Sequence, residues 1–276
     1  MFALNFARRA GLIASVLTVL FGLAACSTTV ATAPATATAA ALTDAPPKAL
    51  LWAGNSFFYY NNSMHGHVGA MLGATGVKGV RQTSVTISGA GINWHDLASY
   101  FKPGGMASYS FVANNEVVFN TFDRPYDAVM MMDCSQCPIH PQLKPIFFDT
   151  ARKHAATARA NGAQPMLFMS WAYQDKPEMT VQLAAEYIVA GRENKALVVP
   201  AGLAFAKSIA KRPDINLYAS DKRHPSLAGT YLGAAVVLAT VFKMSPVGIS
   251  YTAGLAPDVA QHLQNTAWET VQNFKP

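Results

Sequence analysis

Short apolar runs alternate with amphipathic segments along most of the chain. The first run, residues 50–53, ends on Gly54 and is typical of a buried parallel strand. Gly54 permits a sharp exit from that strand, and residues 64–72 can form the helix that follows. Ser56 would then lie at the carboxyl end of a strand, where open α/β sheets place their ligand sites.

The same alternation continues to the carboxyl end of the chain. Strands that alternate with helices predict one parallel, doubly wound sheet with helices on both faces, a flavodoxin-like three-layer α/β/α sandwich. Between residues 102 and 125 the pattern predicts only a short strand, at 117–119. The other predicted strands cover 80–87, 126–133, 165–170 and 196–199, and the other predicted helices cover 92–101, 145–161, 179–193, 201–211, 226–242 and 258–273.

The first 25 residues have the form of a secretory signal. Arg8 and Arg9 precede an apolar stretch over residues 11–22, which is too short to span a bilayer comfortably. Residues 23–26 read Leu-Ala-Ala-Cys and resemble the lipobox of bacterial lipoproteins. That resemblance implies cleavage before Cys26 and acylation of Cys26, and an ordinary signal followed by a chance cysteine is the alternative.

Composition changes again after Cys26. Residues 27–48 are rich in Ala, Thr and Pro and cannot bury enough apolar surface to fold alone. The chain therefore divides into a signal peptide (1–25), a tether (26–48) and one folded domain (49–276). Of the 276 residues, 51% are hydrophobic, which suffices for one large core. The charge of +6 forms no basic cluster and does not indicate nucleic-acid binding.

A second polar stretch, far from Ser56 in the sequence, carries the groups that a nucleophilic serine requires. Asp221 and His224 are three residues apart in a loop that precedes a predicted helix. A nucleophilic serine needs a base, and the base needs an orienting carboxylate. The pairing predicts a Ser–His–Asp triad, whereas Ser56 taken alone is more typical of a polar residue in a tight turn.

Two blocks together resemble the SGNH/GDSL hydrolase superfamily. The first is Gly54-Asn55-Ser56-Phe57, in which Asn55 stands where the signature more often has Asp, and the second is Asp221-x-x-His224-Pro225. The likeness extends from about residue 49 to residue 237. Phe58 occupies the place of the second glycine of the α/β-hydrolase elbow, which disfavours that unrelated fold.

The resemblance implies roles for further residues. Ser56 becomes the nucleophile, His224 the general base and Asp221 the carboxylate that holds the histidine tautomer. The oxyanion hole would combine the Ser56 N–H, the N–H of Gly89 (with Gly91 a close rival) and a side-chain amide after the third strand. The usual G-x-N-D block is absent there, and Gln136 stands at the position of its asparagine. A loop-capping role is the alternative for Gln136.

The pair Cys134-x-x-Cys137 is open to three interpretations: a redox pair, half of a metal site, or a disulfide. A disulfide is favoured, because exported proteins face an oxidising compartment and two cysteines are too few for a structural zinc site. Three histidines are expected to be packed or exposed rather than ligands, and three aromatic residues to line a pocket or the core. They are His65, His67 and His95, and Trp94, Trp171 and Tyr173.

The resemblance as a whole implies an exported serine esterase that works through an acyl-enzyme without a metal or cofactor. Its implied substrates are small esters or O-acetylated carbohydrates. Acylation of Cys26 would anchor the protein to a membrane. Because Ser27 rather than Asp follows the cysteine, that would be the outer membrane of a bacterial envelope, facing the periplasm. A non-catalytic glycan-binding lipoprotein and an O-acyltransferase with the same triad are the alternatives, and the sequence leaves acyl length and oligomeric state open.

Overall fold

The computed structural model describes residues 45–276 except 107 and 123. The predicted signal peptide, Cys26 and most of the predicted tether lie outside the described residues. Among the helices that it does describe, none combines the length and apolar character needed to cross a bilayer.

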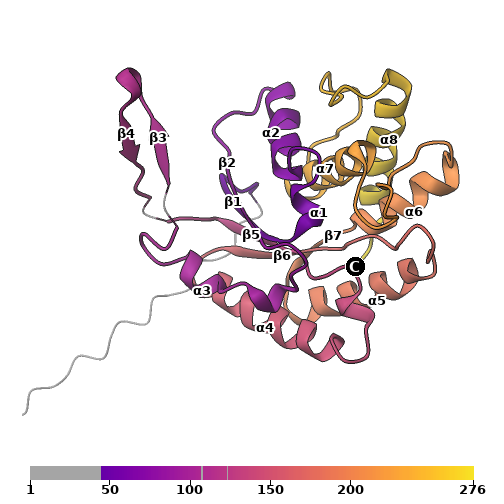
Figure 1. Ribbon diagram of the computed structural model, residues 1–276, viewed down its shortest axis with the longest axis horizontal. Helices are drawn as coiled ribbons and strands as arrows, with labels where there is room; N and C mark the ends of the chain where they lie inside the picture. The colour runs from indigo at the N-terminus through magenta and orange to yellow at the C-terminus, as the bar shows by residue number, and fades with distance from the viewer. Residues whose placement is uncertain (1–44, 107, 123) are drawn as a thin grey trace, which may run out of the picture. The chain divides into compact units, whose positions relative to one another are not determined.

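Five strands form one parallel sheet, with β1 paired to β2 on one side and to β5 on the other. The spatial order is β2-β1-β5-β6-β7, which confirms the predicted flavodoxin-like winding (Figure 1). The strands are β1 (Ala49–Gly54), β2 (Arg81–Thr86), β5 (Ala128–Met131), β6 (Gln164–Phe168) and β7 (Leu197–Val199).

Strand β1 is buried on both faces because its side chains alternate between two apolar cores. Leu50 and Trp52 pack into one core and Leu51 into the other, and all three are fully buried. The first core lies under α2 (Met64–Ala74), α6 (Ala201–Lys211), α7 (Leu227–Val241) and α8 (Pro257–Asn273), and the second under α3 (Leu97–Tyr100), α4 (Lys144–Ala160) and α5 (Met179–Glu193) (Figure 1).

The predicted helix over residues 92–101 is wrong, because the segment forms two short pieces. A 3-10 turn, η1 (Ile92–Trp94), is followed by the extended residue His95, and α3 begins only after Asp96. The Asp96 carboxylate accepts a hydrogen bond from the Ser99 N–H at 3.3 Å and caps the new helix. This local cap interrupts the helix that the apolar spacing alone predicts.

The short strand predicted at 117–119 is present as β4 (Val117–Phe119), but it does not join the main sheet. It pairs antiparallel with β3 (Tyr109–Phe111) in a separate two-stranded sheet, and η2 (Ala113–Asn115) connects the two strands. Every other predicted strand and helix is present, with ends that differ by at most two residues.

The loop before α7 packs closely against the first turn of that helix. Ser226 caps the helix, since its Oγ accepts a hydrogen bond from the Gly229 N–H at 3.2 Å. A side-chain Cβ at Gly229 would lie only 2.3 Å from the backbone oxygen of Leu217. The approach of these two backbones therefore requires glycine at position 229.

We expect Gly229→Ala to lower the free energy of unfolding by about 1–3 kcal/mol, because the new methyl group meets backbone that cannot move easily. Gly73→Ala in α2 is the matched control: nothing lies within 4 Å of its added Cβ, so alanine should raise stability by up to about 1 kcal/mol. Urea unfolding of the two variants measures the contrast. Equal stabilities would show that the contact with Leu217 imposes no constraint.

Candidate active site

Ser56 is the first residue of α1 (Ser56–Tyr59), directly after β1. The helix starts here because Asn55 caps it: the Asn55 Oδ1 accepts a hydrogen bond from the Phe57 N–H at 3.1 Å. Ser56 is therefore at the carboxyl end of β1, beside the β1–β5 boundary where the strand order reverses. Ligand sites of open α/β sheets occur at this kind of boundary.

Asn55 also ties together three segments that follow three neighbouring strands. Its Nδ2 donates to the carbonyl oxygen of Ala90, after β2, at 2.9 Å and to that of Asp133, after β5, at 3.1 Å. The side chain is buried, and all of these partners are backbone groups. The sequence indicated Asn55 only as a variant of a signature and did not reveal this bridging role.

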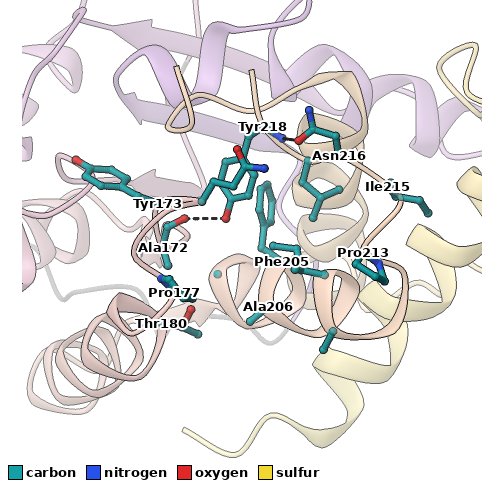
Figure 2. A pocket seen from close by; sticks show the side chains of 15 residues that line it. Ala172, Tyr173, Pro177, Thr180, Phe205, Ala206, Pro213, Ile215, Asn216 and Tyr218 are labelled. Atoms are coloured by element: carbon teal, nitrogen blue, oxygen red, sulfur yellow. Dashed lines mark hydrogen bonds between the residues drawn. The ribbon is translucent and has the colours of Figure 1, made fainter. Parts of the chain in front are cut away.

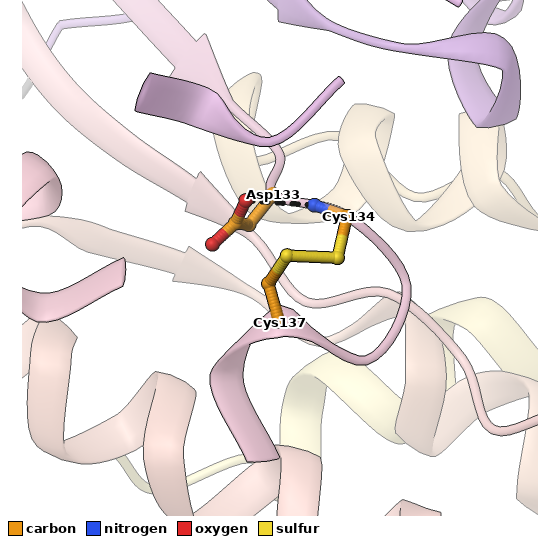
Figure 3. A group of neighbouring side chains, drawn as sticks. All are labelled: Asp133, Cys134 and Cys137. Carbon is orange, nitrogen blue, oxygen red and sulfur yellow. Dashed lines mark hydrogen bonds between the residues drawn. A yellow bond between two sulfur atoms is a disulfide. The ribbon is translucent and has the colours of Figure 1, made fainter. Parts of the chain in front are cut away.

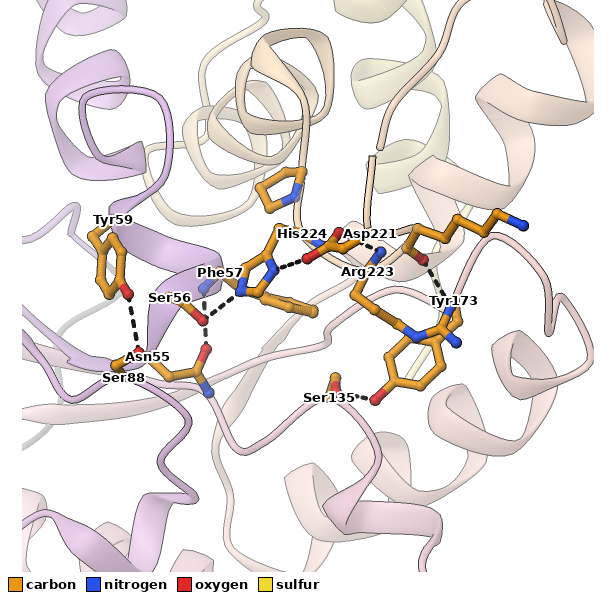
Figure 4. A network of polar contacts seen from close by, with 12 residues as sticks. Asn55, Ser56, Phe57, Tyr59, Ser88, Ser135, Tyr173, Asp221, Arg223 and His224 are labelled. Atoms are coloured by element: carbon orange, nitrogen blue, oxygen red, sulfur yellow. Dashed lines mark hydrogen bonds and ion pairs between the residues drawn. The ribbon is translucent and has the colours of Figure 1, made fainter. Parts of the chain in front are cut away.

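The structure brings Ser56, His224 and Asp221 together although 168 residues separate the first two (Figure 4). The Ser56 Oγ is 2.7 Å from the His224 Nε2, and the His224 Nδ1 contacts the Asp221 Oδ2. With Nδ1–H donating to the carboxylate, Nε2 is left to accept the serine proton, and this tautomer is inferred from the partners. The order serine, imidazole, carboxylate is that of a catalytic triad.

Backbone groups of its own loop orient the Asp221 carboxylate as well. The N–H groups of Arg223 and His224 both donate to its Oδ1 at 2.9 Å. Desolvation would raise the pKa of Asp221, but the His224 side chain and these two N–H groups outweigh it and lower the pKa to about 2. Asp221 is thus an anion throughout the physiological pH range and fixes the imidazole through charge.

Aromatic rings fix the orientation of the histidine. Tyr60 stacks on the His224 ring with centroids 4.2 Å apart, and Phe57 meets it edge-on at 5.2 Å. Phe57 in turn stacks on the buried ring of Trp171, whose Nε1 donates to the Arg223 oxygen at 3.0 Å. These contacts restrict rotation of the imidazole, so that Nε2 keeps facing Ser56.

Two glycines lie opposite the serine in the segment after β2, each required for a different reason. Gly89 has a φ of 72°, in the left-handed region that favours glycine. At Gly91 a Cβ would lie 2.6 Å from the Asn93 Oδ1 and 2.8 Å from the Asp133 Oδ1. Among the described residues, no acceptor pairs with the backbone N–H of Ser56, Gly89 or Gly91. These N–H groups can therefore serve as donors to a bound oxyanion.

Asp133 holds this glycine segment in place. Its Oδ1 accepts hydrogen bonds from the Ile92 N–H at 2.9 Å and the Cys134 N–H at 2.8 Å, while His154 donates from Nε2 to the Ile92 oxygen at 3.0 Å. Burial raises the pKa of Asp133 from 3.8 to about 6, against the opposing effect of the two N–H donors. The sequence did not indicate a role for Asp133 in the site, and its one signal there is a lone carboxylate at the end of an apolar strand.

No hydrogen bond joins the Gln136 side chain to the triad residues. Gln136 is exposed, it precedes the 3-10 turn η3 (Cys137–Ile139), and its side chain makes no hydrogen bond to the described residues. Cys134 and Cys137 on either side of it form a disulfide (Figure 3). Asp133 lies beside the two sulfurs, but sulfurs bonded to each other are not available as thiolate ligands to a metal.

Two cavities are lined in part by residues that the sequence singled out. One, of about 230 Å³, is lined by Gly89, Gly91, Asn93 and Trp94, among others. The other, of about 340 Å³, lies between α5, α6 and the loop over residues 213–218 and is mostly apolar (Figure 2). Trp94 and Tyr173 each line one of these cavities.

The predicted histidines are packed within the fold. His67 contacts the Tyr251 hydroxyl at 2.8 Å, His95 donates to the Gly54 oxygen at 3.0 Å, and the His65 Nδ1 lies 2.6 Å from the Ser63 Oγ. Hydrogen bonds to the protein therefore account for each of these imidazoles.

Comparison with protein-family models and with curated proteins finds no match to the chain. Several solved structures are similar. A DUF4886 family protein from Bacteroides uniformis is 15% identical, with a TM-score of 0.57 over 82% of this chain and 95% of that one. A protein classed with the SGNH hydrolases, from Slackia heliotrinireducens, is 21% identical, with a TM-score of 0.52 over 70% and 97%. A catalytic mutant of an acetylxylan esterase from Geobacillus stearothermophilus is 15% identical, with a TM-score of 0.50 over 70% and 93%.

These likenesses define the fold. The chain has the α/β/α fold of the SGNH hydrolases, a superfamily of hydrolases and esterases that its serine and histidine blocks already resemble. Sequence identities this low show that the architecture is shared, but they do not show that the activity is shared.

We expect the buried Asp133 to make stability depend on pH. Its pKa is higher in the folded state than in the unfolded chain, so the folded state favours the neutral acid. Its contribution is most favourable below about pH 4 and is lost as the pH rises through about 6. Asp133→Asn keeps the acceptor oxygen and removes the charge. The stability of the variant relative to wild type should therefore rise between pH 4 and 7, by about 3 kcal/mol at most.

Urea unfolding at several pH values measures this difference, and Asp149→Asn on the surface of α4 controls for removal of one carboxylate. A gap between Asp133→Asn and wild type that stays constant with pH would contradict a buried, weakly acidic Asp133.

Proposed function

We propose that the protein is a serine esterase that hydrolyses carboxylic esters through an acyl-enzyme. The single observation that carries the proposal is the 2.7 Å contact between the Ser56 Oγ and the His224 Nε2, with Asp221 bound to the opposite ring nitrogen. A serine hydroxyl in such a contact can lose its proton to the imidazole as it attacks.

In the proposed first step the Ser56 Oγ attacks the ester carbonyl carbon while His224 takes the hydroxyl proton. Negative charge develops on the carbonyl oxygen, and the unpaired N–H groups of Ser56 and Gly89 are the donors that we assign to it, with Gly91 the rival of Gly89. The C–O bond to the alcohol then breaks, and the alcohol leaves with the proton from His224. Ser56 is left as an acyl ester.

The second step repeats the first with water. His224 takes a proton from a water molecule, whose oxygen attacks the acyl carbon of the Ser56 ester. The carboxylic acid leaves, and Ser56 recovers its proton from the histidine. No metal or cofactor is needed in this sequence, since the base, the nucleophile and the oxyanion donors all come from the chain.

For the substrate we propose O-acetylated carbohydrate. Two observations support it. The cavity of about 230 Å³ beside Gly89 and Gly91 suits a small acyl or sugar group, and Trp94 on its rim is 62% exposed, offering a flat ring to a sugar. One similar solved structure is an acetylxylan esterase.

We further propose that the protein is exported and anchored through an acylated Cys26. The lipobox-like residues 23–26 support this proposal, and the mass of the mature amino-terminal peptide tests it.

A fluorophosphonate probe should label Ser56, and Ser56→Ala or His224→Ala should lower kcat on short aryl esters by about 10⁴-fold or more. Asp221→Asn should leave more activity than either. Mapping of the adduct by mass spectrometry and steady-state kinetics provide the measurements.

Ser135→Ala is the matched control, since Ser135 also follows a strand but contacts Tyr173 instead of a histidine. The fluorophosphonate probe should label the Ser135→Ala variant as fully as it labels the wild-type protein. Adduct on another residue, or full turnover by Ser56→Ala, would rule out the proposed mechanism.

Two side-chain amides, those of Asn93 and Gln136, are candidates for the remaining oxyanion donor. Asn93 lines the same cavity as the two glycines, whereas Gln136 does not, so we now favour Asn93 over Gln136. Asn93→Ala should lower kcat by roughly 100- to 1000-fold with KM little changed, and Gln136→Ala should change kcat by less than about tenfold. The opposite result would restore Gln136 as the donor.

A further inference from the structure

The β3–β4 hairpin exposes an unusual amount of apolar surface. Seven of the fourteen large hydrophobic side chains that are exposed in the described chain lie between residues 109 and 122. Phe111 is 74% exposed, Phe119 70% and Tyr109 55%. Figure 1 shows the hairpin projecting away from the helices that cover the sheet. Exposed apolar clusters on this scale usually mark an interaction surface.

Four of the exposed apolar side chains of the hairpin gather on one face. Tyr109 lies opposite Phe119, and Phe111 opposite Val117, so these four side chains share a face of the two-stranded sheet. The other face carries Val118, which pairs with Ser110, and hydrogen-bonded polar groups: the Asn120 side chain donates to the Ser108 and Ser110 hydroxyls. The three aromatic side chains of the two strands are therefore all on one face. An isolated two-stranded hairpin is only marginally stable in water, and a partner for the apolar face would stabilise it.

A groove at the base of the hairpin adds positive charge to this surface. Its volume is about 500 Å³, and Arg81 and Lys102 line it. Arg81 packs on the Phe122 ring and donates to the Pro125 oxygen, and neither cation has an acidic partner among the described residues. The aromatic rings that line the groove are Tyr100, Phe101, Phe119, Phe122 and Tyr126.

The described chain begins beside this same base. The N–H groups of Lys48 and Ala49 donate to the Asp127 Oδ2 at 2.9 and 3.0 Å, and Asp127 follows the hairpin by only a few residues. The amino-terminal segment and the hairpin therefore meet the sheet at the same end. In the sequence, 22 residues (27–48) lie between Cys26 and the start of β1.

We propose that the hairpin and its basic groove dock into the interface of a bilayer that contains anionic phospholipid. Aromatic side chains favour the membrane–water interface, and Arg81 and Lys102 would face the lipid phosphates. The choice of a bilayer as the occupant rests on the proposed acylation of Cys26, whose tether ends at the base of the hairpin. The proposal does not depend on esterase activity.

The test uses the chain from residue 26 onward with Cys26→Ser, so that no acyl chain contributes to binding. This form should float with vesicles of phosphatidylglycerol mixed with phosphatidylethanolamine, and less with vesicles of phosphatidylcholine alone. The double variant Phe111→Ser/Phe119→Ser should lower the bound fraction about tenfold or more. Lys102→Gln should reduce the preference for anionic vesicles, and added salt should do the same.

Val181→Ser on α5 is the matched control, because Val181 is 77% exposed but far along the chain from the hairpin. It should leave binding unchanged. Turnover of a soluble aryl ester should be the same in all variants, which separates failure of this proposal from failure of the proposed esterase. Equal flotation of the hairpin and control variants would overturn membrane docking. So would a hairpin-dependent dimer in solution, which would assign the face to a second copy of the chain.

Discussion

The buried side chain of Asn55 is the contact on which the site depends. One amide caps the helix that starts at Ser56 and donates to backbone oxygens after β2 and β5. Buried polar groups are costly unless they are paired, so the three segments must meet at Asn55 for its hydrogen bonds to form. The positions of the serine and of the glycine segment are thereby coupled to each other.

Asp133 and His154 also hold the glycine segment in place, through hydrogen bonds to Ile92. The carboxylate accepts from the Ile92 N–H and the imidazole donates to the Ile92 oxygen, so the two successive peptide groups on either side of the Ile92 Cα are both held. Donors that are preorganised in this way stabilise an oxyanion without reorganising during the reaction. A buried acid whose pKa is about 6 is therefore tolerated at the edge of the proposed site because it orients the backbone there.

The base of the hairpin and the triad lie at opposite ends of the parallel sheet. The chain enters β1 at Ala49, beside the hairpin base, and leaves it at Gly54, just before Ser56. Six strand residues, about 20 Å, separate the two ends. Docking of the hairpin on a membrane would thus leave the triad at the far end of the sheet, open to substrates in the aqueous compartment.

Patterns in the sequence predicted the fold class, and they also indicated Ser56, His224 and Asp221, which the structure brings into contact. Continuous apolar runs predict buried parallel strands, and the spacing of Asp221 and His224 is local, so both can be recognised without a structure. The tertiary structure decided which groups surround them. Tyr60 stacks on His224, Asn93 rather than Gln136 lines the cavity, and β4 pairs outside the main sheet. Those contacts join residues distant in sequence or reverse a local preference, and no periodicity along the chain encodes them.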